Sequence, residues 1–214
     1  MKKIFFLLFV SSALIGKAQF SASNLSAGIS GNYLSFFKSK FSTVGAKVDL
    51  GYQYSEKLTA ILSYTYSSPI KSASSYYFGG TSSYTIPTEI STKISTVSLG
   101  VQYFLKANPE GLSVYLPVGA SFIFGGSTGK ATGPSVPAGN SLPAGYTEKE
   151  KFSSYMMFGG MGAMYAIGPV KLFADGGVAI PANNVNGAYV EVNVDTHLFA
   201  NVGVRIPFGI PDSE

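Results

Sequence analysis

The sequence predicts an all-β fold, an eight-stranded antiparallel up-and-down transmembrane β-barrel. Three observations predict it. Apolar and polar residues alternate with a period of two along eight segments, as in strands whose two faces meet different surroundings. The links between these segments alternate between short and long. Charged residues make up only 12% of the chain, roughly half of their usual share in soluble domains.

The N-terminal segment has the pattern of a secretory signal peptide. Lys2 and Lys3 form a basic start, and an apolar run of twelve residues follows over residues 4–15. Gly16 and Ala18 place small residues at the −3 and −1 positions of a cleavage site. Because twelve residues are too few to cross a bilayer as a helix, we expect residues 1–18 to be cleaved.

Cleavage would change the charge of the protein. The whole chain has fifteen Lys and Arg against eleven Asp and Glu, and the segment removes Lys2, Lys3 and Lys17, which leaves twelve against eleven. A nearly neutral mature protein without a basic tract is not expected to bind nucleic acid. The absence of cysteine excludes disulfides. The remaining chain predicts one barrel domain over residues 19–208 and a short tail over residues 209–214.

The first four predicted strands include the most regular hairpin of the chain. Residues 44–54 place Val48 and Leu50 on one face and Lys47 and Asp49 on the other, and the pattern restarts at residue 58. The predicted segments are 25–33, which is the least regular, 44–54, 58–67 and 97–105.

The last four predicted strands follow the same alternation. Residues 155–167 are rich in glycine and less regular, and the final segment is the longest. The predicted segments are 112–124, 155–167, 170–180 and 190–208. Nothing in the mature chain has a helical period of 3.6 residues.

The connections predict how the barrel lies in an outer membrane. The links at residues 55–57, 106–111 and 168–169 are short, whereas the links over residues 68–91 and 125–151 are long and rich in Ser, Gly, Pro and Thr. Outer-membrane barrels have short periplasmic turns and longer external loops. We therefore expect the two long loops outside the cell and both termini in the periplasm of a Gram-negative bacterium.

The apolar face of each strand is expected to point outward, toward lipid. The other face consists mostly of Gly, Ser, Thr and Gln, which suits the narrow interior of an eight-stranded barrel better than a soluble exterior. Aromatic residues on the apolar face fall near the strand ends, as in the girdles at the two bilayer interfaces. The predicted girdles comprise Tyr33, Tyr64, Tyr66, Phe122, Phe124 and Tyr155 at the external end, and Tyr52, Tyr54, Tyr103, Tyr165 and Phe208 at the periplasmic end.

Over residues 20–208 the chain resembles the small outer-membrane β-barrel family typified by the OmpA transmembrane domain and OmpX. The resemblance includes the alternating last strand, His197 to Phe208, which ends in an aromatic residue as in segments read by the barrel-assembly machinery. Here six residues follow Phe208, whereas the aromatic commonly ends the chain, and the periplasmic peptidoglycan-binding domain of OmpA is missing. The resemblance implies a fold rather than an activity, because one fold supports many functions.

Both signs of charge are predicted inside the barrel. Two interpretations follow: a charge-compensated plug that closes the lumen, or a gated polar channel. The lumen-facing ionisable residues are Lys47, Asp49, Lys171, Asp175, Glu191, Asp195, His197 and Arg205.

His197, the only histidine, offers an alternative function. Lipid A-modifying barrel enzymes use a His with a Ser and an acidic residue, and Asp195 lies two positions away on the same face. In those enzymes the catalytic residues point toward lipid, whereas His197 falls on the inward face, so no catalytic residue is assigned. One His and no Cys also give no metal site, and no cofactor is predicted.

The predicted function is a non-enzymatic outer-membrane barrel with a structural role in the envelope or a role in surface adhesion. Loop aromatics such as Tyr76, Tyr77, Phe78 and Tyr84 could contact an extracellular ligand or complete the external girdle. The expected partners are outer-membrane lipid and lipopolysaccharide, together with the barrel-assembly machinery during biogenesis. A lipid A-modifying enzyme and a narrow porin-like channel remain the alternatives.

Overall fold

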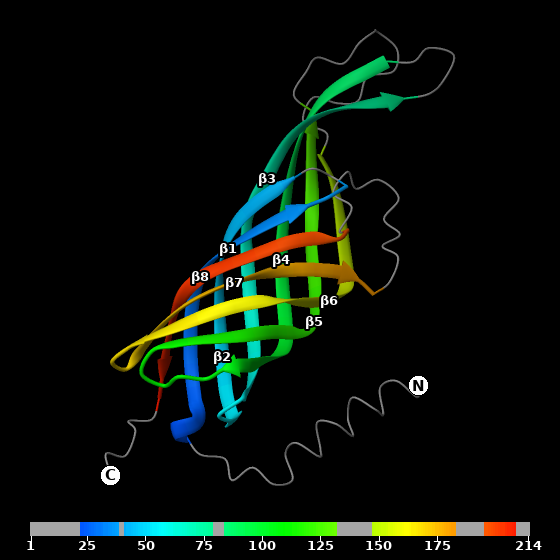
Figure 1. Cartoon of the computed structure of the whole chain (residues 1–214). Coiled ribbons are helices and arrows are strands. Elements are labelled where there is room, and N and C mark those ends of the chain that lie inside the picture. Colours follow the sequence, from blue (N-terminus) through cyan, green and yellow to red (C-terminus); the bar gives the residue numbers. More distant parts are fainter. Residues whose placement is uncertain (1–21, 39–40, 79–83, 132–146, 183–194, 209–214) are drawn as a thin grey trace.

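Eight antiparallel strands form a closed barrel in which each strand pairs with its neighbours in the chain and β8 returns to β1 (Figure 1). The structure is a computed structural model and describes residues 22–38, 41–78, 84–131, 147–182 and 195–208. The strands are β1 (Leu25–Phe36), β2 (Ser42–Ser55), β3 (Leu58–Phe78), β4 (Tyr84–Lys106), β5 (Leu112–Ala131), β6 (Thr147–Ile167), β7 (Val170–Pro181) and β8 (His197–Pro207). The predicted fold class is confirmed.

One short helical element precedes the first strand, the 3-10 helix η1 (Ala22–Asn24). Within the described residues, no helix has both the length and the apolar character needed to traverse a membrane.

Closure of the barrel depends on the pairing of its first and last strands. The ladder between β1 and β8 runs without interruption from Ser26 opposite Pro207 to Phe36 opposite His197. Each unpaired backbone group in hydrocarbon would cost several kcal/mol, roughly 4–8 by transfer data, so a sheet in lipid is stable only when its two edges join.

The two faces of the wall are oriented as the sequence predicts. Outward residues are accessible, with Val202 69% exposed and Leu62 50% exposed. Their inward neighbours are buried, and Ser63 and Asn201 are at most 6% exposed. The apolar face is therefore the outer surface of the barrel, and the polar face lines the lumen.

The two ends of the barrel differ. At one end, called here the short-turn end, β2 joins β3, β4 joins β5, and β6 joins β7 through the short links that the sequence predicts. Gly168 in the last of these turns has a φ of 58°, a left-handed conformation that glycine adopts without steric cost. Leu25 and Pro207, at the outer limits of β1 and β8, also lie at this end. The opposite end is called the long-loop end.

The described residues of the predicted loops over residues 68–91 and 125–151 are strand instead. β3 continues to Phe78 and β4 starts at Tyr84, with pairing up to Phe78 opposite Tyr84. β5 and β6 likewise pair up to Lys130 opposite Thr147. The Ser- and Thr-rich composition of these segments predicted loops. Threonine and isoleucine nevertheless favour extended structure when a neighbouring strand supplies hydrogen bonds.

The extension begins at an irregularity that the sequence marks with a proline. The register between β3 and β4 shifts between Ser67 and Ile70, and Pro69 lies in this interval. Proline has no N–H to donate to a ladder, so it is tolerated at such a bulge.

The last strand is shorter than predicted. β8 starts at His197, and Asp195 and Thr196 precede it outside regular structure. The predicted strand residues 190–194, including Glu191, lie outside the described residues, as do the signal peptide at 1–18 and the tail at 209–214. Those assignments remain predictions.

Candidate functional site: the closed lumen and the projecting sheet

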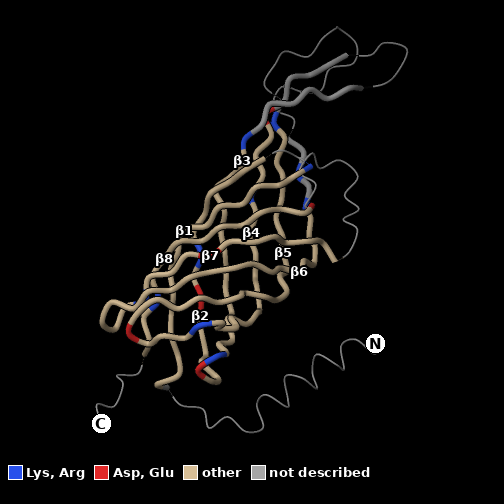
Figure 2. The backbone as a smooth tube through the Cα atoms, in the orientation of Figure 1, with Lys and Arg blue, Asp and Glu red and all other residues tan. Residues whose placement is uncertain are grey.

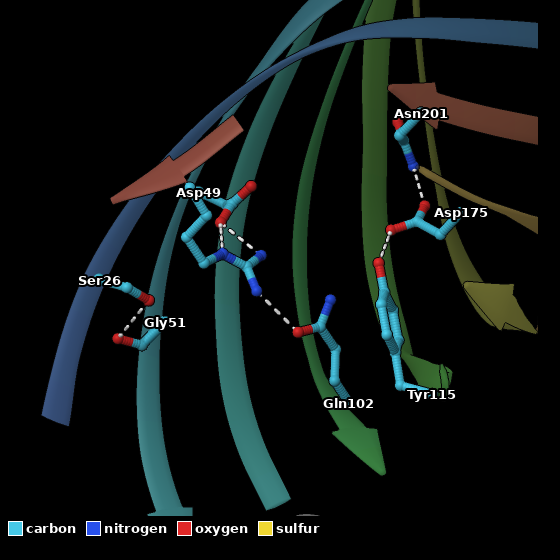
Figure 3. Close-up of polar contacts among 8 residues, drawn as sticks. Ser26, Asp49, Gly51, Gln102, Tyr115, Asp175 and Asn201 are labelled. Carbon is cyan, nitrogen blue, oxygen red and sulfur yellow. Dashed lines mark hydrogen bonds and ion pairs between the residues drawn. The ribbon is translucent and has the colours of Figure 1, made fainter. Parts of the chain in front are cut away.

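A buried ion pair lies in the lumen, as predicted. The Arg205 guanidinium donates from Nη2 to Asp49 Oδ1 at 2.7 Å and from Nε to the same oxygen at 3.1 Å (Figure 3). Its Nη1 donates to Gln102 Oε1 at 2.7 Å, and the guanidinium carbon lies 5.2 Å from the centre of the Phe173 ring. Asp49 and Arg205 are each 4% exposed, so the pair is removed from water.

A glycine between the two partners makes this ion pair possible. Gly28 in β1 is paired with Asp49 on one side and with Arg205 on the other. A Cβ atom at Gly28 would lie 2.6 Å from Asp49 Oδ1, so any larger residue would displace the carboxylate. Because Gly28 has no side chain, the side chains of Asp49 in β2 and Arg205 in β8 meet across β1.

A second polar group uses the same arrangement. Tyr115 in β5 donates to Asp175 Oδ2 at 2.9 Å, and Gly162 in β6 pairs with both residues (Figure 3). A Cβ at Gly162 would lie 2.5 Å from the Tyr115 ring. Asn201 donates to Asp175 Oδ1 at 2.6 Å, and Asn32 donates to Asn201 Oδ1 at 2.7 Å. Hydrogen bonds thus connect β5, β7, β8 and β1 across the lumen.

The remaining predicted lumen residues have different environments. Lys47 and Lys171 point inward and are half-buried, but neither forms an ion pair with a described residue. Asp195 and His197 are buried at the long-loop end. The prediction of charges inside the barrel is confirmed, whereas the charge compensation among the described residues is confined to one pair, Arg205 with Asp49.

The sequence analysis missed an apolar layer across the lumen, which we call the septum. It lies in the half of the barrel toward the long-loop end and includes side chains from six strands. Its buried members are Leu34, Phe36, Ile70, Ile94, Ile123, Phe152, Met156 and Ala179, with Phe41, Phe158 and Phe199 packed against them. Apolar residues on both faces of the same strand segment, such as Leu34 and Phe36 beside Tyr33, could have indicated this layer.

The barrel interior contains cavities, and two of them concern its polar residues. A chamber of about 80 Å³ lies next to the septum, and Lys47, Gln102 and Asn201 are among its lining residues. A cavity of about 350 Å³, which we call the mouth, is lined mainly by residues of the short-turn end, including Asn108 and Lys171. A second apolar cluster of Tyr115, Met164 and Phe173 packs in the same half of the barrel. The lumen therefore consists of alternating packed and polar layers.

The catalytic arrangement considered for His197 is not assembled. The hydrogen-bond partner of the His197 Nδ1 atom is the backbone oxygen of Asp195, at 3.1 Å, rather than the Asp195 carboxylate. The carboxylate oxygen Oδ2 of Asp195 accepts from the backbone N–H of Lys38 at 2.6 Å. The His197 ring lies inside the barrel with its centre 4.7 Å from that of Phe36.

Metal binding has no support in the described ranges, since no group of three or more His, Asp or Glu side chains there could hold an ion.

Beyond the barrel, parts of β3, β4, β5 and β6 form a sheet that we call the projecting sheet; Figure 1 shows it rising above the ends of the other strands. It starts where β2 ends its ladder with β3, at Gly45 opposite Ser67. From Ile70 to Phe78, β3 pairs with β4 alone among the described strands. β6 pairs with β7 only from Met156 onward, so residues 147–153 form the other edge among the described strands.

Charged residues mark the limits of the barrel wall. Figure 2 shows wide uncharged stretches of the strands, with most charges toward the two ends. In β4, twelve uncharged residues separate Lys93 from Lys106. At ~3.3 Å per residue and a strand tilt of ~45°, this stretch spans about 28 Å along the barrel axis, close to the thickness of a hydrocarbon core. Exposed charges on the projecting sheet include Lys71, Glu89, Lys130, Lys149 and Lys151.

The fold and its outward apolar wall define the class of the protein as a small eight-stranded antiparallel barrel of the outer-membrane type. Neisserial surface protein A (NspA) is similar over 86% of this chain and 97% of its own, with a TM-score of 0.55 at 15% identity. A major outer membrane protein from Thermus thermophilus matches 85% of this chain and 98% of its own, with a TM-score of 0.56 at 13% identity.

At these identities the likeness shows the fold alone, and it confirms the barrel that the resemblance to the OmpA and OmpX family implied. No protein-family model matches the chain, and no curated protein matches it.

Proposed function

We propose that this protein is a non-enzymatic outer-membrane barrel that holds a β-sheet above the cell surface for recognition or adhesion. The projecting sheet is the observation that carries the proposal. Beyond the septum residue Ile70, the extension of β3 from Lys71 to Phe78 would reach roughly 26 Å at ~3.3 Å per residue. In this proposal the short-turn end and both termini face the periplasm, and the long-loop end faces outward.

The outer wall supports insertion into an outer membrane. Its outward side chains are apolar, and exposed charges bracket an uncharged band of bilayer thickness. Lipid tails would contact the row that contains Leu62 and Val202, and lipopolysaccharide would contact the aromatic residues near the long-loop end. The alternating β8 would be the segment read by the barrel-assembly machinery.

The closed lumen supports a structural or adhesive role rather than transport. The septum crosses the interior with buried side chains that are at most 8% exposed. The Arg205–Asp49 pair lies between the septum and the short-turn end. An eight-stranded barrel has an interior only wide enough for side chains to fill. We therefore assign the interior to stability and the projecting sheet to external contacts.

An exposed strand edge is itself a binding surface. The backbone N–H and C=O groups along an unpaired edge can pair with an extended segment of another protein, which provides affinity without requiring a pocket. The β3 edge between Ile70 and Phe78 and the β6 edge over residues 147–153 have this property among the described strands. The Lys71–Glu89 pair, at 3.8 Å and well exposed, gives this surface a polar character suited to water.

The experiment compares three forms displayed on a non-adhesive Gram-negative host. They are the intact protein, a variant in which residues 72–90 are replaced by Asn-Gly, and a control in which residues 132–146 are shortened. Retention of cells on a protein-coated surface is measured under flow. We expect at least a tenfold loss of retention for the first variant and little change for the control.

Surface display and heat-modifiable migration on SDS gels verify that each barrel is folded. Equal retention of the intact protein and the hairpin-trimmed variant, both displayed at equal amounts, would refute the adhesive role.

A further inference from the structure

The mouth cavity at the short-turn end contains a cation, Lys171, that forms no ion pair with a described residue. The cavity, about 350 Å³ in volume, is lined by three ionisable residues, Glu56, Lys171 and Arg205. Lys171 in β7 is half-buried, and Glu56 lies exposed in the β2–β3 turn. The other polar lining residues include Asn108 and Ser113 from the β4–β5 connection and strand β5.

Lys171 and Arg205 are like charges held side by side. They are direct partners in the ladder between β7 and β8, and both line the cavity. Like charges directly opposite one another in a sheet are destabilising. Asp49 balances Arg205 through two hydrogen bonds, at 2.7 and 3.1 Å, and no described carboxylate balances Lys171. A half-buried ammonium group beside a guanidinium favours an additional anion.

Neutral polar residues such as Asn108 and Ser113 also line the cavity. Polar side chains at its rim belong to the turns of the short-turn end, so an anion at Lys171 would remain accessible from outside the barrel. Anions that meet an ammonium group in a partly desolvated site form hydrogen bonds roughly twice as strong as those between neutral groups.

We propose that the mouth is a carboxylate-binding site centred on Lys171. A carboxylate bound there would accept a hydrogen bond from Lys171 Nζ and balance the charge that Asp49 leaves uncompensated. This proposal concerns the short-turn end and does not depend on the adhesive function of the projecting sheet.

The sequence supplies two carboxylates beyond the last described residue. Asp212 and Glu214 follow Phe208 by four and six residues. The backbone N–H of Phe208 donates to Leu25 O at 2.8 Å, which fixes the exit of β8 beside Leu25 and Pro207, two residues that line the mouth. Four residues span up to about 13 Å when extended, so Asp212 is one candidate source of the carboxylate. A soluble carboxylate is the other source with the same chemistry.

Two measurements on the refolded full chain distinguish these sources. A zero-length carbodiimide reagent joins an amine to a carboxylate in direct contact, and mass spectrometry then identifies the joined peptides. Acylation of lysine amines by a water-soluble ester measures how strongly each amine is protected. We compare the intact protein with the double variant Asp212→Asn/Glu214→Gln, each with and without succinate in excess at constant ionic strength.

If the tail is the occupant, Lys171 becomes joined to Asp212 or Glu214, and its acylation is at least fivefold faster in the double variant. Succinate then restores the protection. If a soluble carboxylate is the occupant, no such join forms, and succinate slows the acylation of Lys171 equally in both proteins. Lys106, exposed at the same end, is the control and reacts at one rate throughout.

Two results would overturn the proposal. One is a join between Lys171 and Glu56 alone, which would make the cavity an ordinary internal ion pair. The other is an acylation rate of Lys171 that neither the tail substitutions nor succinate changes. Heat-modifiable migration of each variant excludes misfolding as the cause.

Discussion

The buried pair of Arg205 and Asp49 allows the most quantitative test of how the barrel interior is stabilised. Replacing Arg205 with Met removes three hydrogen bonds and leaves the Asp49 carboxylate buried without its counter-ion. At an effective dielectric constant of ~20, charges about 4 Å apart interact by about 4 kcal/mol. We therefore expect Arg205→Met to lower the free energy of unfolding by about 4 kcal/mol, within the usual ~3–5 kcal/mol for breaking such a pair.

The neutral partner substitution should cost less. Asp49→Asn leaves the Arg205 guanidinium buried without its counter-ion, but the amide oxygen still accepts from Arg205 and Gln102 keeps its hydrogen bond, so we expect a loss of about 3 kcal/mol, at the lower end of that range. The double variant Arg205→Met/Asp49→Asn leaves no buried charge at this site and should lose about 3 kcal/mol, less than the sum of the single losses.

The assay is reversible urea unfolding in phospholipid vesicles. The chain has fourteen Tyr and no Trp, so far-ultraviolet circular dichroism and tyrosine fluorescence report the transition. The exposed pair Lys71–Glu89 serves as the control, and Lys71→Met should change stability by less than about 0.5 kcal/mol. Additive losses for Arg205→Met and Asp49→Asn, or a loss below about 1 kcal/mol for Arg205→Met, would refute the reasoning.

Three further predictions concern packing, lipid contact and conduction. Gly162→Ala should cost about 1–3 kcal/mol in the same assay, because the new methyl group would meet the Tyr115 ring, whereas Gly31→Ala, with no atom closer than 3.9 Å, should be neutral. Equal effects at the two glycines would contradict the close approach at Gly162. Leu62→Arg should lower the free energy of unfolding by about 2–4 kcal/mol in a bilayer, because this side chain points to lipid. Leu62→Ala is the control, and a cost of Leu62→Arg below about 1 kcal/mol relative to it would count against lipid contact. The intact protein should give no steady single-channel current in planar bilayers, because the septum closes the lumen, and a sustained current would disprove that closure.

The alternation of the strands made the barrel predictable from the sequence. Each inward position such as Asp49 sits between outward positions such as Val48 and Leu50, and the continuous ladders of the barrel wall preserve this parity from strand to strand. The short turns were also predictable, since the pattern breaks at residues 55–57, 106–111 and 168–169. The alternation of inward and outward side chains is a local property of each strand, so it can be predicted from a single sequence.

The sequence placed Asp49 and Arg205 in the lumen, but which lumen residues pair depends on contacts between distant strands. Asp49 and Arg205 are 156 residues apart, and only the β1 register places Gly28 between them. The projecting sheet was taken for loops because Ser and Thr dominate it, although neighbouring strands determine whether such segments pair. The septum was missed because Phe36 and Ile94 lie beyond the predicted strands 25–33 and 97–105, so neither residue was assigned to a face of the wall.

Site-directed spin labelling tests the central claim, the orientation of the wall, most directly. The chain contains no cysteine, so single cysteines can be introduced at Leu62, Leu99 and Val202 on the outer face and at Ser63 on the inner face. In lipid vesicles, labels at the outer positions should collide freely with dissolved oxygen and be shielded from a water-soluble nickel complex. The label at Ser63 should be shielded from oxygen in the bilayer. Strong contact of the outer labels with the nickel complex, or immobilised and shielded labels at all three outer positions, would contradict the account.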